Sequence, residues 1–291
     1  AALKGGLPAS VGATTINKVC GSGLKAVMLG AALIRAGEAE TVVAGGMELM
    51  SGAPYLLPGA RHGYRLGNGE LVDAMVHDGL WCAFEQQHMG NSAEWIAREQ
   101  RVTRAQQDQY ALQSHERAVA AIDAGRFADE IAPVTVPGPR GAQIVVAADE
   151  APRRDSSLHA LAKLRPAFEK DGSVTAGNAP GITDGAAALV LMREARAAAL
   201  GLAPLARVGQ AAQAARPPLE VFAAPPDAIA RLMERAGTTV DDYDLFELNE
   251  AFAAQVIANI RAAGLDPDRV NVNGGAIALG HPIGASGARV L

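Results

Sequence analysis

The sequence predicts an α/β fold, in which short apolar strands alternate with amphipathic helices. After Cys20, apolar residues recur at helical spacing, at positions 24, 27, 28, 31 and 34. A short apolar run, Thr41–Ala44, follows and is closed by two glycines, as a buried strand would be. The same alternation returns from Asp184 onward. The 291 residues, 49% hydrophobic and 20% charged, suffice for about two domains, or one large one, with a sizeable core.

The N-terminal part predicts one strand–helix–strand unit. Thr14–Val19 is expected to be a strand that runs into Cys20, and residues 21–36 a helix that stops at Gly37. With Thr41–Ala44 as the second strand, this is the unit from which α/β layers are built.

The middle of the chain breaks this rhythm. Residues 47–87 carry prolines, glycines and scattered charge, and a loop-rich excursion of this length is usually functional or an interface. Thr103 is a good N-cap for a helix. Beyond the excursion we expect, in order, helices His88–Gln100 and Arg104–Ala124, strands Ile131–Val136 and Ile144–Ala147, and an irregular segment over residues 149–173.

The C-terminal part returns to alternating elements. We expect strands Ala187–Met192, Leu205–Ala212, Asp244–Leu248 and Val270–Val272, and helices Arg193–Leu200, Pro226–Ala236, Glu250–Ala263 and one beginning near Gly284. The chain begins shortly before a predicted strand and ends within a predicted helix. We therefore expect it to be a fragment of a longer protein.

Composition excludes several classes of protein. The net charge is −5 and no basic run is interleaved with aromatic residues, so nucleic acid is not an expected partner. The two cysteines, Cys20 and Cys82, are too few for a disulfide framework and fit a reducing compartment. No run of 18 apolar residues indicates a membrane span, and the first residues lack the features of a signal peptide, so we expect a cytoplasmic location. The histidines and cysteines form no ligand-spaced cluster, so no metal is expected.

Cys20 is the first candidate for a catalytic residue. It lies at a predicted strand-to-helix junction, where unpaired N–H groups and the helix dipole lower a thiol's pKa and can stabilise an oxyanion. Gly21 and Gly23 let a ligand approach the backbone closely. The alternative is a small buried cysteine that fills core space.

His281 is the second candidate. Gly280 and Pro282 place it on a sharp turn, and the four glycines of the segment 273–284 suggest a backbone packed against a ligand. A neutral imidazole near a thiol can act as its base. The alternative is a turn histidine with no role in catalysis. The segments 22–25 and 286–289, which follow Cys20 and His281, are similar in sequence. Duplicated halves and chance would both explain this.

Three further segments carry weaker signals. Asn249 follows a predicted strand, where ligands gather in open α/β sheets, and its amide could hold a water. The simpler interpretation is an N-cap, and the two roles are compatible. His88 opens a predicted helix and could be a capping histidine. The glycine-rich residues 177–181 resemble a phosphate or pantetheine loop only loosely, and neither a P-loop nor a clear dinucleotide fingerprint is present.

Together, these segments resemble the thiolase family. The resemblance rests, in family order and over nearly the whole chain, on Asn17–Gly23, Gly45–Glu48, His88–Gly90, Lys163–Phe168, Ala176–Gly181, Asn249–Gln255 and, most specifically, Asn271–Arg289. It implies duplicated α/β layers (αβαβα) with an inserted loop domain. On this basis residues 1–50 are the remainder of the N-terminal half with the nucleophile. Residues 51–173 contain the loop domain for CoA and oligomer contacts, together with flanking elements of the N-terminal half. Residues 174–291 are an incomplete C-terminal half.

The resemblance implies an acyl-CoA:acetyl-CoA C-acyltransferase. Such an enzyme cleaves 3-ketoacyl-CoA thiolytically, as in fatty-acid β-oxidation, or condenses acetyl-CoA in the reverse Claisen direction. Cys20 would attack an acyl-CoA thioester and become acylated. His281 would activate Cys20 and, with a water held by Asn249, bind the oxygen of the second CoA substrate as it becomes an enolate. The backbone N–H of Cys20 would contribute to a second oxyanion hole. CoA and acyl-CoA are substrates, and no cofactor is implied.

The resemblance also implies where CoA would bind. Arg153 lies near the position that contacts the nucleotide end. The pantetheine and acyl channel would be lined by Leu80, His88, Met89, Phe168 and Phe252, together with Ala176 and Pro180 of the glycine-rich loop. Pro180 replaces a serine common in the family, and Val221–Pro226 departs from its Met-Gly-x-Gly-Pro pattern. Residues 55–69 occupy the place of the loop that joins dimers in tetrameric thiolases, so a homo-oligomer, dimer or tetramer, is expected.

One family motif is not in this sequence. Thiolases use a second cysteine, in a glycine-rich C-terminal motif, to remove the α-proton, and Cys82 does not lie in such a motif. We therefore expect this chain alone not to complete a full catalytic cycle. Two other readings stay open. One is a ketoacyl-synthase-like condensing enzyme with a carrier-protein donor, although such enzymes pair Cys with two His. The other is a non-catalytic thiolase-like protein that binds CoA.

Overall fold

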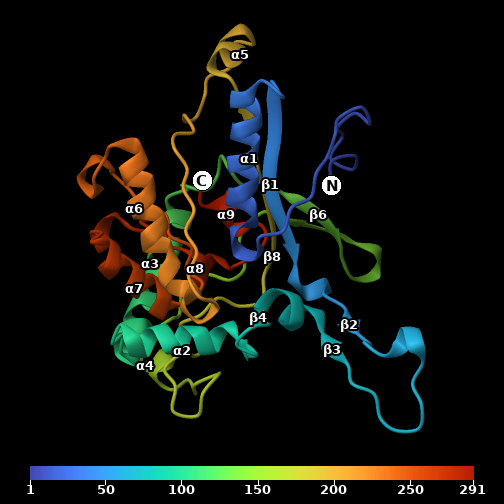
Figure 1. Ribbon diagram of the computed structural model, residues 1–291, viewed down its shortest axis with the longest axis vertical. Helices are drawn as coiled ribbons and strands as arrows, with labels where there is room; N and C mark the ends of the chain where they lie inside the picture. The colour runs from blue at the N-terminus through green and yellow to red at the C-terminus, as the bar shows by residue number, and fades with distance from the viewer.

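The computed structural model describes residues 1–291, in which a helix and a long two-stranded ribbon stand at the centre of the molecule (Figure 1). The helices are α1 (Ser22–Ala36), α2 (Met89–Glu99), α3 (Arg104–Asp123), α4 (Leu158–Ala162), α5 (Glu194–Ala199), α6 (Ala224–Ala236), α7 (Ala253–Ala263), α8 (Ala276–Leu279) and α9 (Ser286–Arg289). The strands are β1 (Thr41–Leu49), β2 (Tyr55–Leu56), β3 (Val72–Asp73), β4 (Trp81–Cys82), β5 (Gln87–His88), β6 (Val134–Pro137), β7 (Gln143–Val146) and β8 (Asp184–Met192).

The central unit consists of α1, β1 and β8, and it joins the N-terminal and C-terminal parts of the predicted α/β pattern. β1 pairs antiparallel with β8 along its whole length, from Thr41 opposite Met192 to Leu49 opposite Asp184. α1 packs on this ribbon through Val27 and Ile34, which are buried with Ala44 and Leu191. The helix ends where predicted, because Gly37 takes the left-handed conformation, with φ of 83°, that closes a helix.

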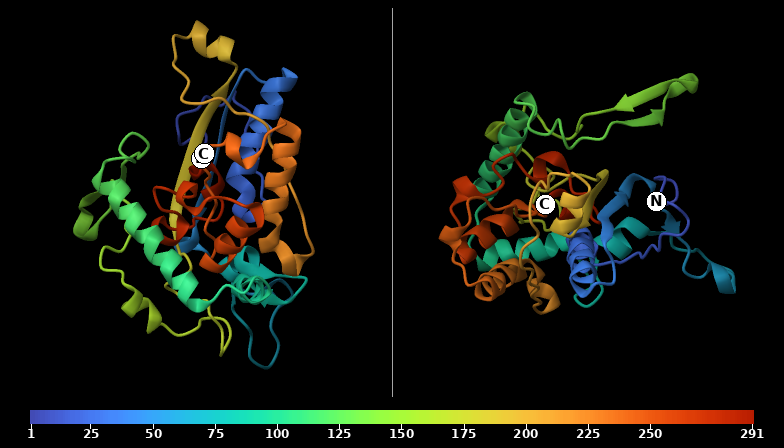
Figure 2. Two further views of the ribbon diagram at one scale, coloured as in Figure 1. Left: turned by 90° about the vertical axis from the view of Figure 1, so that its left-hand side faces the viewer. Right: turned by 90° about the horizontal axis from the view of Figure 1, so that it is seen from above.

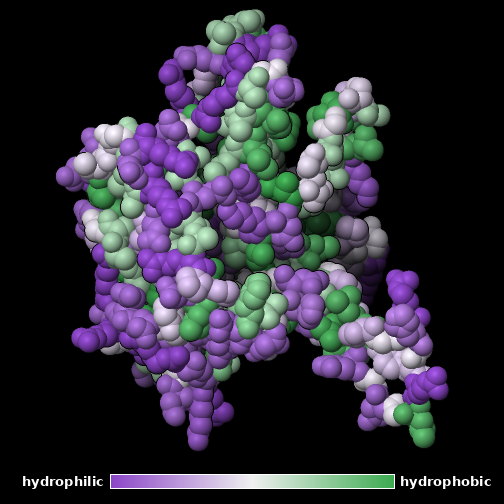
Figure 3. Space-filling view, in the orientation of Figure 1, coloured by the Kyte–Doolittle hydropathy of each residue, from purple (hydrophilic) through white to green (hydrophobic).

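α1 is also both long and apolar. The window Val19–Ala36 has a mean hydropathy of 1.4, so by length and composition alone it could cross a membrane. One such helix is weak evidence, since a core helix passes the same test. In the fold α1 packs on β1, β8 and α9, with 28% of the window buried. Figure 3 shows hydrophobic surface along the exposed side of α1 and β1, where Leu29, Leu33 and Val43 are exposed.

Small residues bring α9 into backbone contact with the central unit. A Cβ atom on Gly23 of α1 would lie 2.5 Å from the Ala288 nitrogen, and one on Gly287 of α9 would lie 2.4 Å from the Leu24 nitrogen. Gly46 of β1 has no room for a side chain against the carbonyl of Gly284. The C-terminal segment is therefore held against the start of α1 and the middle of β1.

A layer of helices lies beside the central unit (Figures 1 and 2). α7 is its core: Ala254 and Ala258 pack against Ile96 and Ala97 of α2. α3 begins with the predicted N-cap, since Thr103 and Gln106 form a reciprocal capping box. Away from these layers, the β6–β7 hairpin projects from the body of the molecule (Figure 2, right).

Four predicted strands are not strands in the structure. Residues 14–19 and 205–212 have no regular secondary structure apart from the short 3-10 turn that begins at Val19. Residues 244–248 and 270–272 meet in one parallel bridge, Phe246 with Val270. These segments have strand-like composition, but a strand needs a neighbouring backbone to pair with, and along most of their length none lies alongside.

Other predicted elements shift at their ends. The predicted helix over Glu250–Ala263 begins at Ala253, with Phe252 in the N-cap position, so the interpretation of Asn249 as an N-cap is wrong. β1 and β8 run longer than predicted, since β1 continues through Gly45 and Gly46. The segment 149–173, predicted to be irregular, contains the short helix α4.

The close contact at Gly287 predicts a stability change. Gly287→Ala forces a methyl group against the Leu24 nitrogen, so we expect the free energy of unfolding to fall by about 1–3 kcal/mol. Gly209→Ala is the matched control, because nothing lies within 4 Å of the added atom, and its effect should stay below about 1 kcal/mol. Urea denaturation of both variants measures the difference; equal stabilities would contradict the packing described here.

Candidate active site

Cys20 is presented by a strained turn. Val19, directly before it, has a φ of 47°, a conformation that a β-branched residue adopts only at a cost. Two side chains hold the turn. Asn17 Oδ1 accepts a hydrogen bond from the Val19 N–H at 2.8 Å, and the Ser22 hydroxyl donates to the Val19 carbonyl at 2.7 Å. Lys18 N–H donates to the Ser22 hydroxyl in turn. The sulfur therefore has a fixed direction at the start of α1.

The imidazole of His281 meets this sulfur. His281 Nε2 lies 3.2 Å from Cys20 Sγ, although the residues are 261 positions apart in the sequence. The other ring nitrogen, Nδ1, lies 2.6 Å from Ser286 Oγ, and the single hydrogen of that hydroxyl is donated to the Pro282 carbonyl. Nδ1 must then carry the ring hydrogen and donate it to Ser286. Nε2 is left as an acceptor that faces the thiol.

Asn249 completes a cluster of three side chains. Its Nδ2 atom lies 3.4 Å from His281 Nε2, so Cys20 and Asn249 both contact the same ring nitrogen. Asn249 Oδ1 is buried and has no hydrogen-bond partner within the chain. The structure thus brings together the three residues that the sequence suggested for catalysis, and Asn249 keeps a free amide oxygen in the cluster.

Burial determines the protonation states of Cys20 and His281. Burial raises the pKa of the Cys20 thiol from 9.0 to about 11, against an opposing backbone hydrogen bond and with help from the charge of Glu48. Burial, followed by the charge of Arg289, lowers the pKa of His281 to about 4. At neutral pH the pair is a thiol and a neutral imidazole. The expectation that the helix start lowers the pKa of Cys20 is therefore wrong, because burial outweighs it.

A second group of predicted residues forms an aromatic cluster. His88 stacks on Phe168 with ring centroids 4.7 Å apart, and Phe168 meets Phe252 edge-on at 6.1 Å. Met89 packs against the same cluster. The His88 Nδ1 atom accepts a hydrogen bond from the Gly90 N–H, and burial lowers the pKa of His88, so its ring is neutral with a hydrogen on Nε2. His88 is thus both an N-cap for α2 and part of the cluster.

The remaining predicted residues are less closely grouped. Leu80 ends the π-helix Met75–Leu80, whose Gly79 lies against Ile283, two residues after His281. Ala176 is exposed and Pro180 half-buried in the loop that precedes β8. Arg153 is exposed, and its backbone N–H donates to His115 on α3. No hydrogen bond joins Arg153 to the cluster of Cys20 or to the aromatic cluster.

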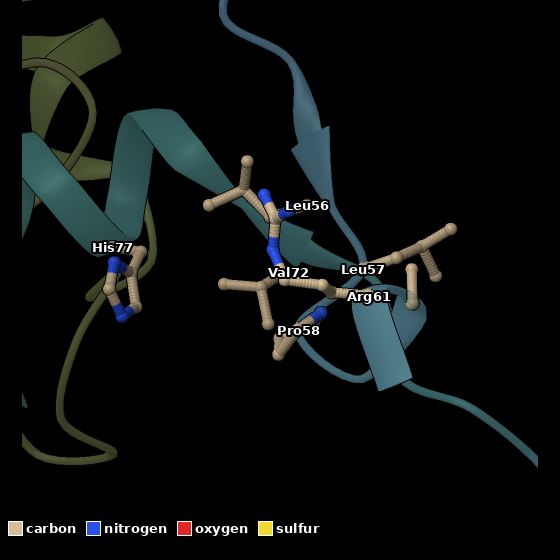
Figure 4. A pocket seen from close by; sticks show the side chains of 7 residues that line it. Leu56, Leu57, Pro58, Arg61, Val72 and His77 are labelled. Carbon is tan, nitrogen blue, oxygen red and sulfur yellow. The ribbon is translucent and has the colours of Figure 1, made fainter. Parts of the chain in front are cut away.

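One concave surface of the chain lies away from the cluster of Cys20. It has a volume of about 740 Å³ and is lined by seven residues of the excursion, including Leu56, Val72 and His77 (Figure 4). No chemistry-bearing cluster faces it, so we do not take it for the site of catalysis. No group of three His, Cys, Asp or Glu side chains could hold a metal ion.

Sequence reasoning missed the residues that support the cluster. Ser286 fixes the ring of His281, and Thr183 accepts a hydrogen bond from the His281 N–H at 3.3 Å. The only signal for Ser286 was the similarity between the segments after Cys20 and His281. Nothing in the sequence pointed to Thr183, because its contact depends on how β8 and the C-terminal loop meet.

Two family models match this chain. One, described as "Thiolase, N-terminal domain", matches residues 1–195, and the other, "Thiolase, C-terminal domain", matches residues 202–291. The chain belongs to the thiolase family. The thiolase resemblance of the sequence motifs is thereby confirmed.

Individual members of the thiolase family support this at full chain length. An acetyl-CoA acetyltransferase of Pseudomonas aeruginosa is 56% identical over 291 residues, which are 100% of this chain and 74% of that protein. A protein of Cupriavidus necator with the same name is 53% identical over the same shares. The crystal structure of the Bacillus anthracis acetyl-CoA acetyltransferase superposes with a TM-score of 0.95 at 44% identity, covering 99% of this chain and 73% of that one. The fold is therefore the α/β thiolase fold.

The raised pKa of Cys20 predicts a slow, strongly pH-dependent thiol. Alkylation by iodoacetamide requires the thiolate, so its rate in the folded chain should rise with pH towards a midpoint near 11. In the denatured chain the midpoint should return to about 9.0. Mass spectrometry of peptides containing Cys20 measures both rates. A midpoint below 7 in the folded chain would instead indicate a thiolate–imidazolium pair.

Proposed function

We propose that this chain performs the acyl transfer of a thiolase between acyl-CoA and acetyl-CoA, with Cys20 as the nucleophile. The observation that carries the proposal is the contact of 3.2 Å between Cys20 Sγ and an unprotonated Nε2 of His281. A thiol beside an oriented base is the arrangement that covalent catalysis through cysteine requires. The names of the relatives, acetyl-CoA acetyltransferases, indicate the same class of substrate.

The first half-reaction forms an acyl-enzyme. Cys20 gives its proton to His281 Nε2 as the sulfur attacks the carbonyl carbon of the acyl-CoA thioester. The tetrahedral intermediate collapses with cleavage of the bond to the CoA sulfur, which leaves with the proton from His281. Because the resting pair is neutral, proton transfer must accompany the attack.

The second half-reaction begins once the imidazole has given up its proton to the departing CoA. A second acetyl-CoA would place its thioester oxygen near the Asn249 amide, whose N–H groups stabilise the enolate as it forms, and His281 Nε2 adds a donor there only when it carries a hydrogen. The enolate carbon attacks the acyl group on Cys20 and releases the thiolate. In the thiolytic direction, Cys20 attacks the 3-keto carbon of 3-ketoacyl-CoA, and the C–C bond breaks to release the enolate of acetyl-CoA. CoA then attacks the acyl group on Cys20 and carries it away. The acceptor of the α-proton is not assigned; Cys82 is buried in β4, where it accepts a hydrogen bond from the Glu85 N–H.

The aromatic cluster is proposed to contact the pantetheine and acyl chain of CoA. Met89, Phe168 and Phe252 offer an apolar wall, and the neutral ring of His88 offers one N–H donor. Leu80, Ala176 and Pro180 are proposed to lie along the same channel, and the exposed Arg153 at the nucleotide end. We keep the division into residues 1–50, 51–173 and 174–291 as a proposal, with CoA and oligomer contacts in the middle part.

Two further properties are proposed, the cellular compartment and the oligomeric state. The two cysteines are both free, and Cys20 must remain reduced to act as a nucleophile, which favours the reducing cytoplasm. Homo-oligomer formation through residues 55–69 rests on the resemblance to tetrameric thiolases, and these residues form an exposed excursion around β2.

Acylation of Cys20 tests the function. After incubation with acetyl-CoA, mass spectrometry should find an acetyl group on Cys20, and Cys20→Ala should abolish it. Cys82→Ala is the matched control and should leave the acylation rate unchanged within roughly twofold. His281→Asn removes the base and should slow acylation by about 10²–10⁴-fold. A carrier-protein thioester that acylates Cys20 faster than acetyl-CoA would favour a condensing enzyme instead, and no acylation from either donor would leave only CoA binding.

A further inference from the structure

A buried carboxylate that the proposed mechanism does not use follows Asn249 directly. Glu250 is only 1% exposed, and its carboxylate forms no salt bridge. Burying a charge without a partner is costly unless hydrogen bonds replace the lost water. Here four donors do so, two to each carboxylate oxygen.

The four donors are of two kinds. Oε1 accepts from the Tyr110 hydroxyl at 2.9 Å and from Asn271 Nδ2 at 3.0 Å. Oε2 accepts from the Ser114 hydroxyl at 2.7 Å and from the Ile277 N–H at 2.9 Å. A hydroxyl can turn and become an acceptor, but an N–H group cannot. An amide NH₂ in place of either oxygen would therefore direct its hydrogens at Asn271 or at Ile277, whichever way it turned.

The two N–H donors belong to the segments on either side of the candidate site. The Asn271 side chain also holds the Leu248 N–H and carbonyl, each at 2.8 Å, so one group fixes the backbone before Asn249 and the side chain after it. Ile277 lies in α8, four residues before His281. A Cβ atom on the neighbouring Gly275 would lie 2.2 Å from the Glu250 carboxyl carbon, so this segment packs directly on the carboxylate.

We propose that Glu250 is a positioning residue for acyl transfer, whose carboxylate sets the distance between Asn249 and His281. It acts through Asn271 on the segment of Asn249 and through Ile277 on the segment of His281, and it touches no substrate. The spacing it holds is the 3.4 Å between Asn249 Nδ2 and His281 Nε2. This inference rests on the proposed function.

Glu250→Gln tests the proposal because it keeps the size of the side chain and replaces one acceptor oxygen with an NH₂ donor. The new NH₂ group repels the N–H of Asn271 or of Ile277, which displaces the segment of Asn249 or that of His281. Small displacements of catalytic groups lower the rate strongly. In single-turnover acylation of Cys20 by acetyl-CoA, we expect the maximal rate to fall roughly tenfold to a hundredfold. The half-saturating concentration of acetyl-CoA should stay within about threefold, since the aromatic cluster is untouched.

Glu94→Gln is the matched control. Glu94 is 2% exposed and accepts hydrogen bonds from the Ser173 N–H and hydroxyl and from the Val174 N–H. No hydrogen bond joins Glu94 to Asn249, His281 or the segments that carry them. We expect the amide variants of both glutamates to lose stability in thermal unfolding, but Glu94→Gln should keep the maximal acylation rate within roughly threefold of the parent chain.

The outcomes separate the inference from the function. If the parent chain is not acylated, the proposed function fails. If it is acylated and Glu250→Gln reacts as fast as Glu94→Gln, the positioning role is wrong. Should Glu250→Gln not fold, Ser114→Ala gives the second readout, because it removes one donor to Oε2 and the acceptor of the Gly275 N–H. We expect a fall of severalfold in its maximal rate at unchanged half-saturation; a rate equal to that of the parent chain overturns the proposal.

Discussion

The hydrogen bond from His281 to Ser286 governs the chemistry that the site can perform. It places the ring hydrogen on Nδ1 and leaves Nε2 free to accept the proton of Cys20. Burial then keeps both partners neutral. A pair of this kind stores no reactive thiolate, so the sulfur becomes nucleophilic only when an electrophile is present to drive the proton to His281. The site gains protection from indiscriminate alkylation and oxidation at the expense of intrinsic reactivity.

The contact between Cys20 and His281 depends on the packing of three parts of the chain that are distant in sequence. α9 and the loop of His281 lie against α1 and β1 with almost no side-chain layer between them, because glycines occur at the points of closest approach. The helix that presents the sulfur and the turn that presents the imidazole are therefore close to one rigid unit. Asn249 contacts this unit from the helical layer through His281. The hydrogen bonds around Glu250 connect the segment of Asn249 to that of His281.

Local patterns in the sequence predicted much of this arrangement. The spacing of apolar residues gave α1 and its end at Gly37, and Thr103 marked the start of α3. The motifs around Cys20, His281 and Asn249 led to the three side chains that the structure brings together. Strands were predicted less well, because composition shows which segments can extend but not whether another backbone will lie alongside. Ladder partners, like the supporting roles of Ser286 and Thr183, are set by tertiary contacts between remote residues.

Val19 shows how stability and reactivity oppose each other within one turn. Its side chain is branched at Cβ, and its φ of 47° belongs to glycine or asparagine by conformational preference. Selection for thermal robustness alone would favour such a replacement. The hydrogen bonds from Asn17 and Ser22 hold the turn nonetheless. The strain at Val19 therefore lowers the stability of the fold, and in return the turn fixes the direction of the Cys20 sulfur. A replacement at Val19 that raises the melting temperature would therefore be expected to leave the Cys20 sulfur less well oriented.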